Sequence, residues 1–232
     1  GAAEPGATAA ERPFLLHSAW RRWRCGIAQG LAIPLLVLLT MAQWLAPFFA
    51  YHFNTGEADD TLGYAVAMSV LTFLAAIVLN FGLAWLGRRL LTARLAPGSY
   101  PLWGLVYFRW WLADRLSESV PTYLINGSPL YAMWLRALGA EVGRDVSLGS
   151  VTIRVPGLVR IGDGATLGNA VNLENARVEG GRLHIGRIDI GADACVDSYV
   201  VLEGDTAVGD WGHLEGQSAL ASGQRVPARK VW

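Results

Sequence analysis

The C-terminal half of the chain repeats in sixes, and this period limits the fold more than any other feature. Aliphatic residues recur every six positions at Ile190, Val196, Leu202, Val208, Leu214, Leu220 and Val226, with a second series at Ile161, Leu167 and Leu173 and an earlier pair at Val142 and Leu148. Glycine directly follows several of them, and we expect it to ease the corners. The pattern predicts a parallel β-helix of about five coils, in which each six residues form a short strand and a corner. Positions eighteen apart then stack on neighbouring coils.

The six-residue register slips twice. The step from Leu148 to Ile161 is thirteen residues, and the step from Leu173 to Ile190 is seventeen, one less than three repeats. The second slip contains the stretch VNLENARVEGGRLHIG, residues 171–186, with Gly180 and Gly181 near its centre. Loops on rigid scaffolds often carry sites. We therefore expect residues 178–183 to leave the coil as a turn or loop.

The N-terminal half reads as a helical hairpin that crosses a membrane. No lysine or arginine occurs between Gly26 and Gly87, and two apolar runs, about residues 27–49 and 62–86, lie in that span. Each run exceeds the roughly 20 residues that cross a bilayer. The polar stretch YHFNTGEADD between them predicts a turn. The alternative is a hairpin buried in a large soluble core.

The arginines predict the orientation of this hairpin. Arg21, Arg22 and Arg24 precede the first run, Arg88, Arg89 and Arg94 follow the second, and the connecting loop has none. The positive-inside rule then places both ends in the cytoplasm. Pro34 and Pro47 should bend or end the first helix. Gln43 and Asn80 should hydrogen-bond across to a neighbouring helix.

Four segments follow from these patterns. Residues 1–24 read as a linker and cytoplasmic basic flank, 25–95 as the transmembrane hairpin, 96–138 as interfacial and connecting helices, and 139–232 as the β-helix. The aromatic stretch PGSYPLWGLVYFRWWLADRL suits a helix at the membrane surface. The alternative, which does not exclude the first, is an ordinary helix packed on the β domain. SPLYAMWLRALG predicts a short helix with Ser128 as N-cap and Pro129 in its first turn. The glycine at position 1 is consistent with a piece of a longer polypeptide or a processed product.

Composition argues against several functions. The 19 basic and 19 acidic residues balance to a net charge of zero, which indicates no nucleic-acid partner. The two cysteines give neither a metal-ligand spacing nor a disulfide framework, so we expect no metal. No phosphate-binding loop, zinc motif or Ser/His/Asp arrangement is evident.

The order of the segments resembles one membrane unit of the poly-lysine-synthetase family. The resemblance rests on PGSYPLWGLVYFRWWLADRL, SPLYAMWLRALGAEVGRDV, IGDGATLG and VEGGRLHIGRIDIGADACV, and it covers about residues 15–232. In that family of non-ribosomal peptide synthetases, several such units follow adenylation and carrier domains. The repeat half alone resembles hexapeptide acyltransferases, which implies a left-handed β-helix.

This resemblance implies a membrane-embedded acyltransferase-like unit that supports or catalyses amide bond formation from carrier-bound aminoacyl thioesters. The thioester donor would be the phosphopantetheine arm of a carrier domain, or coenzyme A, and the chain itself would bind no cofactor. The implied partners are the lipid bilayer of a bacterial inner membrane, sister units and a carrier domain. Two alternatives stay open: a stand-alone membrane acyltransferase that uses acyl-coenzyme A, and a catalytically silent scaffold that shapes a tunnel.

Amide formation needs a base near the amine, and the second slip offers His184. Hexapeptide acyltransferases commonly use a loop histidine, so the resemblance favours His184 as the base, with a structural histidine as the alternative. We set His17 and His52 aside, because one precedes the membrane and the other lies on its outer side. Some related units carry a pattern like L-Q-x-H-x-F-E-D at this slip, where this chain has Ala176 in place of the histidine. That departure favours a supporting role for this unit.

Polar groups beside the slip are candidates for holding a substrate. Asn172, Glu174 and Asn175 would bind an amine or a pantetheine arm, or they are ordinary solvated turn residues. Cys195 and His213 lie eighteen apart with no slip between them, so they should stack on adjacent coils. A Cys–His pair is a possible nucleophile and base. Because no third group is evident from the sequence, we interpret this pair as a coincidence of the repeat.

Overall fold

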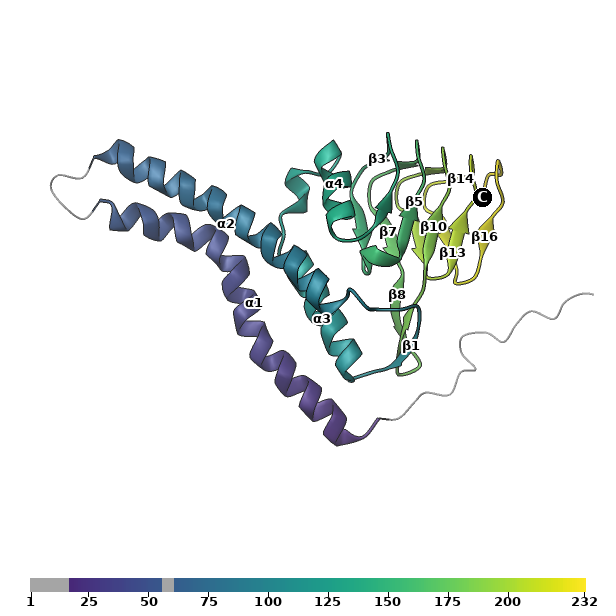
Figure 1. Cartoon of the computed structure of the whole chain (residues 1–232), viewed down its shortest axis with the longest axis horizontal. Coiled ribbons are helices and arrows are strands. Elements are labelled where there is room, and N and C mark those ends of the chain that lie inside the picture. Colours follow the sequence, from purple (N-terminus) through teal and green to yellow (C-terminus); the bar gives the residue numbers. More distant parts are fainter. Residues whose placement is uncertain (1–16, 56–60) are drawn as a thin grey trace, which may run out of the picture.

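The computed structural model describes residues 17–55 and 61–232, and most of residues 1–24 and part of the connecting loop lie outside them. Helix α1 (Ala19–Phe53) and helix α2 (Leu62–Leu91) form a hairpin that extends away from the β domain (Figure 1). Both are long and apolar enough to cross a membrane, yet only 6% of the most apolar window of each is buried. Their apolar side chains therefore face outward, unlike those of a helix in a soluble core.

Polar contacts join the two helices as expected. The buried Asn80 amide donates to the Oε1 of Gln43 at 3.5 Å, and Ser69 donates to the carbonyl of Pro47 at 2.9 Å. Pro34 and Pro47 both lie inside α1, which bends along its length in Figure 1. Proline removes a backbone hydrogen bond and bends a helix where neighbours satisfy the freed groups.

The basic flank lies in the first turns of α1. This helix begins at Ala19, so Arg21, Arg22 and Arg24 are helical. Ser18 caps this helix, because its side chain accepts from the backbone N–H of Arg21.

The connecting region begins with a strand, not a helix. Residues Gly98–Pro101 form β1, and helix α3 (Leu105–Glu118) follows it and contacts both α1 and α2. The short helices η2 (Thr122–Leu124) and α4 (Pro129–Ala137) come next. Helix α4 has Ser128 at its N-cap position and Pro129 in its first turn, as predicted, and it packs on the first strands of the β domain.

Three parallel sheets form the faces of the β-helix. The first contains β2 (Glu141–Val142), β5 (Val159–Ile161), β10 (Ile188–Ile190), β13 (Thr206–Val208) and β16 (Arg225–Val226). The second contains β3 (Ser147–Leu148), β6 (Thr166–Leu167), β11 (Cys195–Val196) and β14 (His213–Leu214). The third contains β4 (Val151–Ile153), β7 (Val171–Glu174), β12 (Val201–Glu203) and β15 (Ala219–Leu220). This pairing confirms the predicted parallel β-helix.

The predicted aliphatic series lies inside the coil. Ile190, Val208 and Val226 pair in register at intervals of eighteen residues, and each is at most 2% exposed. All members of the two longer series are buried in one hydrophobic core. Burial of these side chains, each worth roughly 1.5–3 kcal/mol, holds strands of only two to four residues together.

The glycines of the repeat are required by close stacking. Gly162 has no positive φ, but a Cβ on it would lie 2.5 Å from the backbone nitrogen of Ala192 in the next coil. Positive φ occurs instead at a series of corners six residues apart: Asp193, Tyr199, Asp205, Trp211, Gln217, Gly223 and Arg229. The expectation that these glycines ease the corners is therefore wrong.

Both register slips are visible in the strand pairing. Val142 pairs with Ile161, nineteen residues later, so the first slip adds one residue, near the short helix η3 (Pro156–Leu158). Ile161 pairs with Ile190, 29 residues later instead of eighteen, so the second slip adds eleven. These residues form a hairpin of β8 (Ala176–Glu179) and β9 (Arg182–Ile185).

A buried ion cluster joins the helices to the β-helix. The Arg88 and Asp114 side chains are 2% and 4% exposed and lie 3.6 Å apart, and Arg154 approaches the same carboxylate at 2.8 Å. Arg88 also donates to Ser117 Oγ at 2.7 Å and to the Arg154 carbonyl at 2.6 Å. Residues from α2, α3 and the loop after β4 thus meet at one carboxylate.

Candidate functional site

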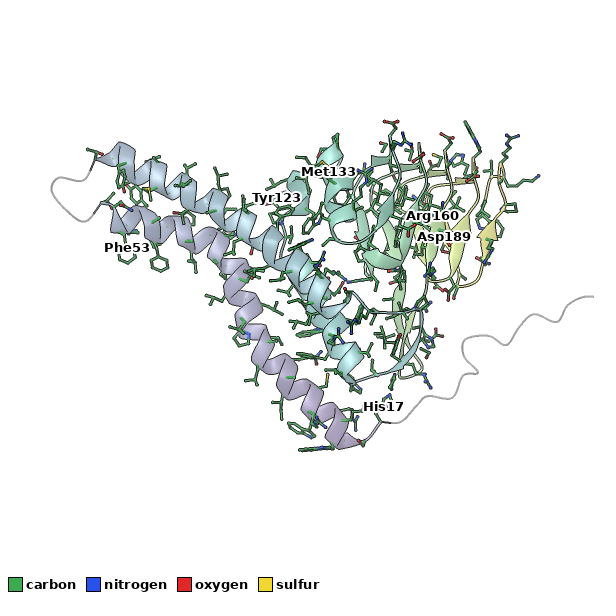
Figure 2. The ribbon with its side chains drawn as sticks, in the orientation of Figure 1. His17, Phe53, Tyr123, Met133, Arg160 and Asp189 are labelled. Carbon is green, nitrogen blue, oxygen red and sulfur yellow. The ribbon has the colours of Figure 1, made fainter. Side chains whose placement is uncertain are left out.

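The second slip forms a β-hairpin that leaves the coil, as predicted. Gly180 and Gly181 form its turn with φ of +56° and +77°, a conformation that favours glycine. Strand β9 also pairs with β1, so the hairpin belongs to a three-stranded antiparallel sheet. The Gly181 carbonyl accepts from the backbone N–H of Leu102 at 3.2 Å and lies 2.6 Å from Nε2 of His17. Figure 2 shows His17 beside this turn, so His17, which the sequence does not favour as a site residue, contacts the predicted loop.

One face of the hairpin is apolar and packed. Ala176, Leu183 and Ile185 are buried together with Val155 and Leu158, in a core separate from that of the β-helix. Aromatic residues of β1 and α3 pack against it, namely Tyr100, Tyr107 and Trp110. The hairpin therefore fastens the β-helix to the helical region.

The opposite face carries His184. Strand pairing places His184 between Ser99 of β1 and Arg177 of β8, and Arg177 forms an ion pair with Glu203 on the coil. Within residues 17–55 and 61–232 the His184 imidazole makes no hydrogen bond, and no carboxylate lies within ion-pair distance of it. A general base is usually oriented by a second group, and this structure supplies none to His184.

The three predicted substrate-binding residues lie in different environments. Asn172 and Glu174 share the outward face of β7, with Glu203 beside Glu174. The Oδ1 of Asn172 is buried without a hydrogen-bond partner among the described residues. Asn175 is 0% exposed, and its amide bonds the N–H and the carbonyl of Val155 at 2.9 and 2.7 Å. Asn175 therefore bridges two segments of backbone, and its side chain is closed to a substrate.

A second cluster lies on the outer face of the β-helix. Cys195 and His213 stack in register on β11 and β14, as the eighteen-residue spacing predicts. Asp197, which the sequence reading overlooked, lies 3.2 Å from Nε2 of His213 and 3.6 Å from Sγ of Cys195. One donor atom from each residue lies within 4.8 Å of the others. The signal was the i, i+2 spacing of Cys195 and Asp197, which places both on one side of a strand.

Electrostatics in this cluster oppose a nucleophilic thiol. Burial, followed by the negative charge and the hydrogen bond of Asp197, raises the pKa of the Cys195 thiol. The thiol therefore stays protonated at neutral pH, whereas the thiolate is the nucleophile and the metal ligand. His213 Nε2 lies within ion-pair distance of the Asp197 carboxylate, but it is buried and makes no hydrogen bond to any described residue. A cavity of about 430 Å³ beside Cys195 and Asp197 gives room for a reacting group.

Comparison with known proteins gives one extensive match. No protein-family model matches the chain. The chain is 46% identical over 211 residues to the delta-poly-L-ornithine synthetase of Acinetobacter baumannii. The chain resembles one segment of a poly-amino-acid synthetase. The match covers 91% of this chain but 16% of that synthetase, so the relative is several times longer. It confirms the resemblance that the segment order predicts.

Solved structures similar to this synthetase-like chain are hexapeptide-repeat acetyltransferases. One is an acetyltransferase from Vibrio cholerae complexed with acetyl-coenzyme A, and it is 16% identical to this chain. The alignment covers 47% of this chain and 76% of the acetyltransferase, with a TM-score of 0.38. The serine acetyltransferase of Neisseria gonorrhoeae is 16% identical, with coverage of 93% and 92% and a TM-score of 0.33. At these scores the fold assignment rests on the strand pairing of the chain itself.

Proposed function

We propose that this chain is a membrane-embedded, acyltransferase-like unit of a poly-amino-acid synthetase, and that it supports amide bond formation from carrier-bound aminoacyl thioesters. The single observation that carries the proposal is the 46% identity over 91% of the chain to a poly-ornithine synthetase. In the reaction an amine attacks a thioester carbonyl, a base takes the amine proton, and the thiol of the phosphopantetheine arm, or of coenzyme A, leaves. Sister units and a carrier domain of the same synthetase would be its partners.

The membrane part of the proposal rests on α1 and α2. Their outward apolar surface would be costly in water, and the arginines gather at one end of the hairpin. In the bacterial inner membrane this end, and with it the β-helix, would face the cytoplasm, where carrier thioesters are formed. The two buried amide side chains, Gln43 and Asn80, bond to each other, which suits helices in lipid.

The supporting role follows from the environment of His184. The imidazole lacks an orienting partner within the described residues, and Ala176 stands where related units carry a histidine. The hairpin also has a structural task, because its other face packs on α3. In this proposal the unit holds and guides the thioester or the growing chain, and a sister unit supplies the base.

Catalysis at the second cluster is the alternative, and the 3.2 Å approach of Asp197 to His213 favours it. A carboxylate beside an imidazole can orient it as a general base. The Cys195 thiol, kept protonated, would then line the site and not attack.

The test is product formation by a full-length synthetase that contains this unit, carrying His184→Ala or His213→Ala, with its level in the membrane measured. Loss of a general base lowers the rate by about 10²–10⁴. We expect both variants to retain the rate per molecule within about threefold. The control is Arg182→Ala, on the same strand as His184 and also partly exposed. A hundredfold loss for His184→Ala alone would overturn the supporting role, and the same loss for His213→Ala would move the chemistry to the second cluster.

A further inference from the structure

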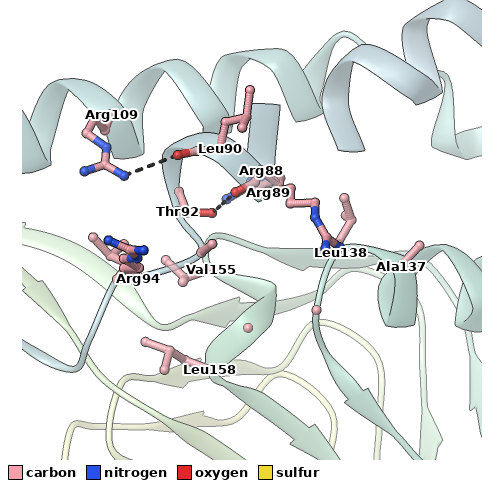
Figure 3. A pocket seen from close by; sticks show the side chains of 14 residues that line it. Arg88, Arg89, Leu90, Thr92, Arg94, Arg109, Ala137, Leu138, Val155 and Leu158 are labelled. Carbon is pink, nitrogen blue, oxygen red and sulfur yellow. Dashed lines mark hydrogen bonds between the residues drawn. The ribbon is translucent and has the colours of Figure 1, made fainter. Parts of the chain in front are cut away.

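A cavity of about 760 Å³ lies where the end of α2 meets α3 and the η3 segment (Figure 3). Apolar residues form part of its wall, namely Leu90, Leu95, Leu138, Val155 and Leu158. Four arginines also line it: Arg88, Arg89, Arg94 and Arg109. None of the described residues that line it is acidic. The wall of the cavity therefore combines apolar side chains with positively charged ones.

One of the four arginines is already neutralised. Arg88 is buried, pairs with Asp114 at 3.6 Å and donates to Ser117 and to the Arg154 carbonyl. Its guanidinium belongs to the buried ion cluster at the joint, the contact between the helices and the β-helix, and it does not need a ligand.

The other three arginines lack such a partner. In the described part of the chain, no carboxylate lies within 4.0 Å of Arg89, Arg94 or Arg109. Arg109 donates to the Leu90 carbonyl at 3.3 Å, and the Arg89 guanidinium lies 5.6 Å from the Trp85 ring. Both contacts position a cation without neutralising it. Figure 3 shows Arg94 and Arg109 reaching toward the same space. Three like charges around one cavity repel each other, and a bound anion would relieve this repulsion.

The position of the cavity identifies the class of anion. It lies at the arginine-bearing end of α2, next to exposed Trp85 and Leu90, where an apolar helix leaves the hydrocarbon layer. Phospholipid headgroups occupy this level, and basic pockets between helices on the cytoplasmic side bind them. The leucine wall beside the arginines suits the glycerol and the start of an acyl chain.

We propose that this cavity binds the phosphate of an anionic phospholipid headgroup and so holds the β-helix against the membrane. The site rests on the proposed membrane embedding, but it adds a specific ligand and three residues that bind it. The phosphate of a phosphopantetheine arm has related chemistry. It is less well matched, because it would reach the cavity from water and would leave the exposed apolar side chains at the mouth without a partner.

The test uses the chain in neutral detergent micelles, titrated with dioleoyl phosphatidylglycerol or, for comparison, dioleoyl phosphatidylcholine. The rise in unfolding temperature reports binding. The pocket variant is Arg94→Gln with Arg109→Gln. Its matched control is Arg22→Gln with Arg24→Gln, which removes two charges from the same end of the hairpin but outside the cavity. We expect a selective response to phosphatidylglycerol that weakens about thirtyfold in the pocket variant and less than threefold in the control.

Three results would overturn the site. The first is an equal response to both lipids, and the second is an equal loss in the pocket and control variants, which would indicate general surface charge. The third is protection by free phosphopantetheine without protection by phosphatidylglycerol. Alkaline carbonate extraction of expressing cells separates this inference from the proposed function. Release of the chain contradicts membrane embedding, whereas a chain that resists extraction and shows no lipid selectivity contradicts the lipid site alone.

Discussion

Replacing Asp114 by Asn should destabilise the joint between the helices and the β-helix. The Asp114 carboxylate receives Arg88 at 3.6 Å, Arg154 at 2.8 Å and Arg115 at 3.1 Å. The Asn side chain has nearly the same shape and keeps one acceptor oxygen, so the main change is the lost charge. Arg88, only 2% exposed at its side chain, would then remain buried without a carboxylate.

The expected loss is about 3 kcal/mol. Removing one partner of a buried pair costs about 3–5 kcal/mol, because the remaining charge is uncompensated. The lower end applies here, since the Arg154 and Arg115 side chains are 29% and 40% exposed and are partly screened by water. For a chain of this size, such a loss lowers the unfolding temperature by roughly 6–12 °C.

Thermal unfolding of the detergent-solubilised chain, followed by circular dichroism, measures this loss. The matched control is Glu118→Gln, one turn along α3, whose carboxylate pairs with Arg115 at 2.5 Å and Arg154 at 3.2 Å but is 48% exposed. An exposed pair is worth at most about 1 kcal/mol, so we expect a shift below about 4 °C. Equal shifts for the two variants would show that the Arg88–Asp114 pair does not hold the joint.

Two further substitutions test the β-helix and the slip. Val208→Asp should lower the free energy of unfolding by several kcal/mol, because it places a charge at a position that is 2% exposed. The control Ala207→Asp, on the other side of the same strand, should be nearly neutral. Similar melting curves for the two variants would contradict the inward assignment of Val208. Asn175→Ala should lower the free energy of unfolding by about 2–4 kcal/mol, since it leaves the buried N–H and carbonyl of Val155 unpaired. The control Asn172→Ala, on β7, should cost less than about 1 kcal/mol, because Asn172 Oδ1 has no hydrogen-bond partner among the described residues. An Asn175→Ala chain as stable as the parent would refute its bridging role.

The β-helix was predictable because its environment repeats. Each buried aliphatic side chain contacts the residues eighteen positions before and after it, so one period in the sequence describes the whole core. The hairpin was predictable for the related reason that an interruption of a strict period must leave the coil. Its antiparallel pairing with β1 was not, because Tyr100 and Leu183 lie far apart in the chain and no local pattern links them.

The buried ion cluster at the joint was not predictable from the sequence, because charged residues such as Arg88 and Asp114 are usually exposed. Arg88 and Asp114 read as a cytoplasmic flank and as the polar side of a surface helix, and their burial depends on how α2, α3 and the β-helix meet. Charged residues are rarely buried unless paired. A single sequence does not show which pairs will form.

In the candidate site, too, the contacts set by the repeat were predictable and those set by tertiary packing were not. The eighteen-residue spacing correctly places Cys195 against His213, and the position of Asp197 follows from the same repeat. The sequence predicts Asn175 as a substrate-binding or solvated turn residue, and its complete burial fits neither. The reason is that the extra residue at the first slip leaves Val155 without a strand partner, and the Asn175 amide takes that place. Whether His184, Asn172 and Glu174 contact a substrate stays a prediction.

The attachment of the hairpin bears on the proposed function. A loop that carries a general base must place it within hydrogen-bond reach of the amine, and catalytic loops often move to do so. This hairpin is held on three sides, by the ladder to β1, by the Gly181 contact with His17 and by the apolar core under α3. Its polar face, with His184 and Arg177, therefore has a fixed position relative to the membrane helices. A fixed polar face suits the positioning of a thioester arm more than proton transfer by a moving loop. This supports the proposed guiding role, in which a sister unit would supply the base.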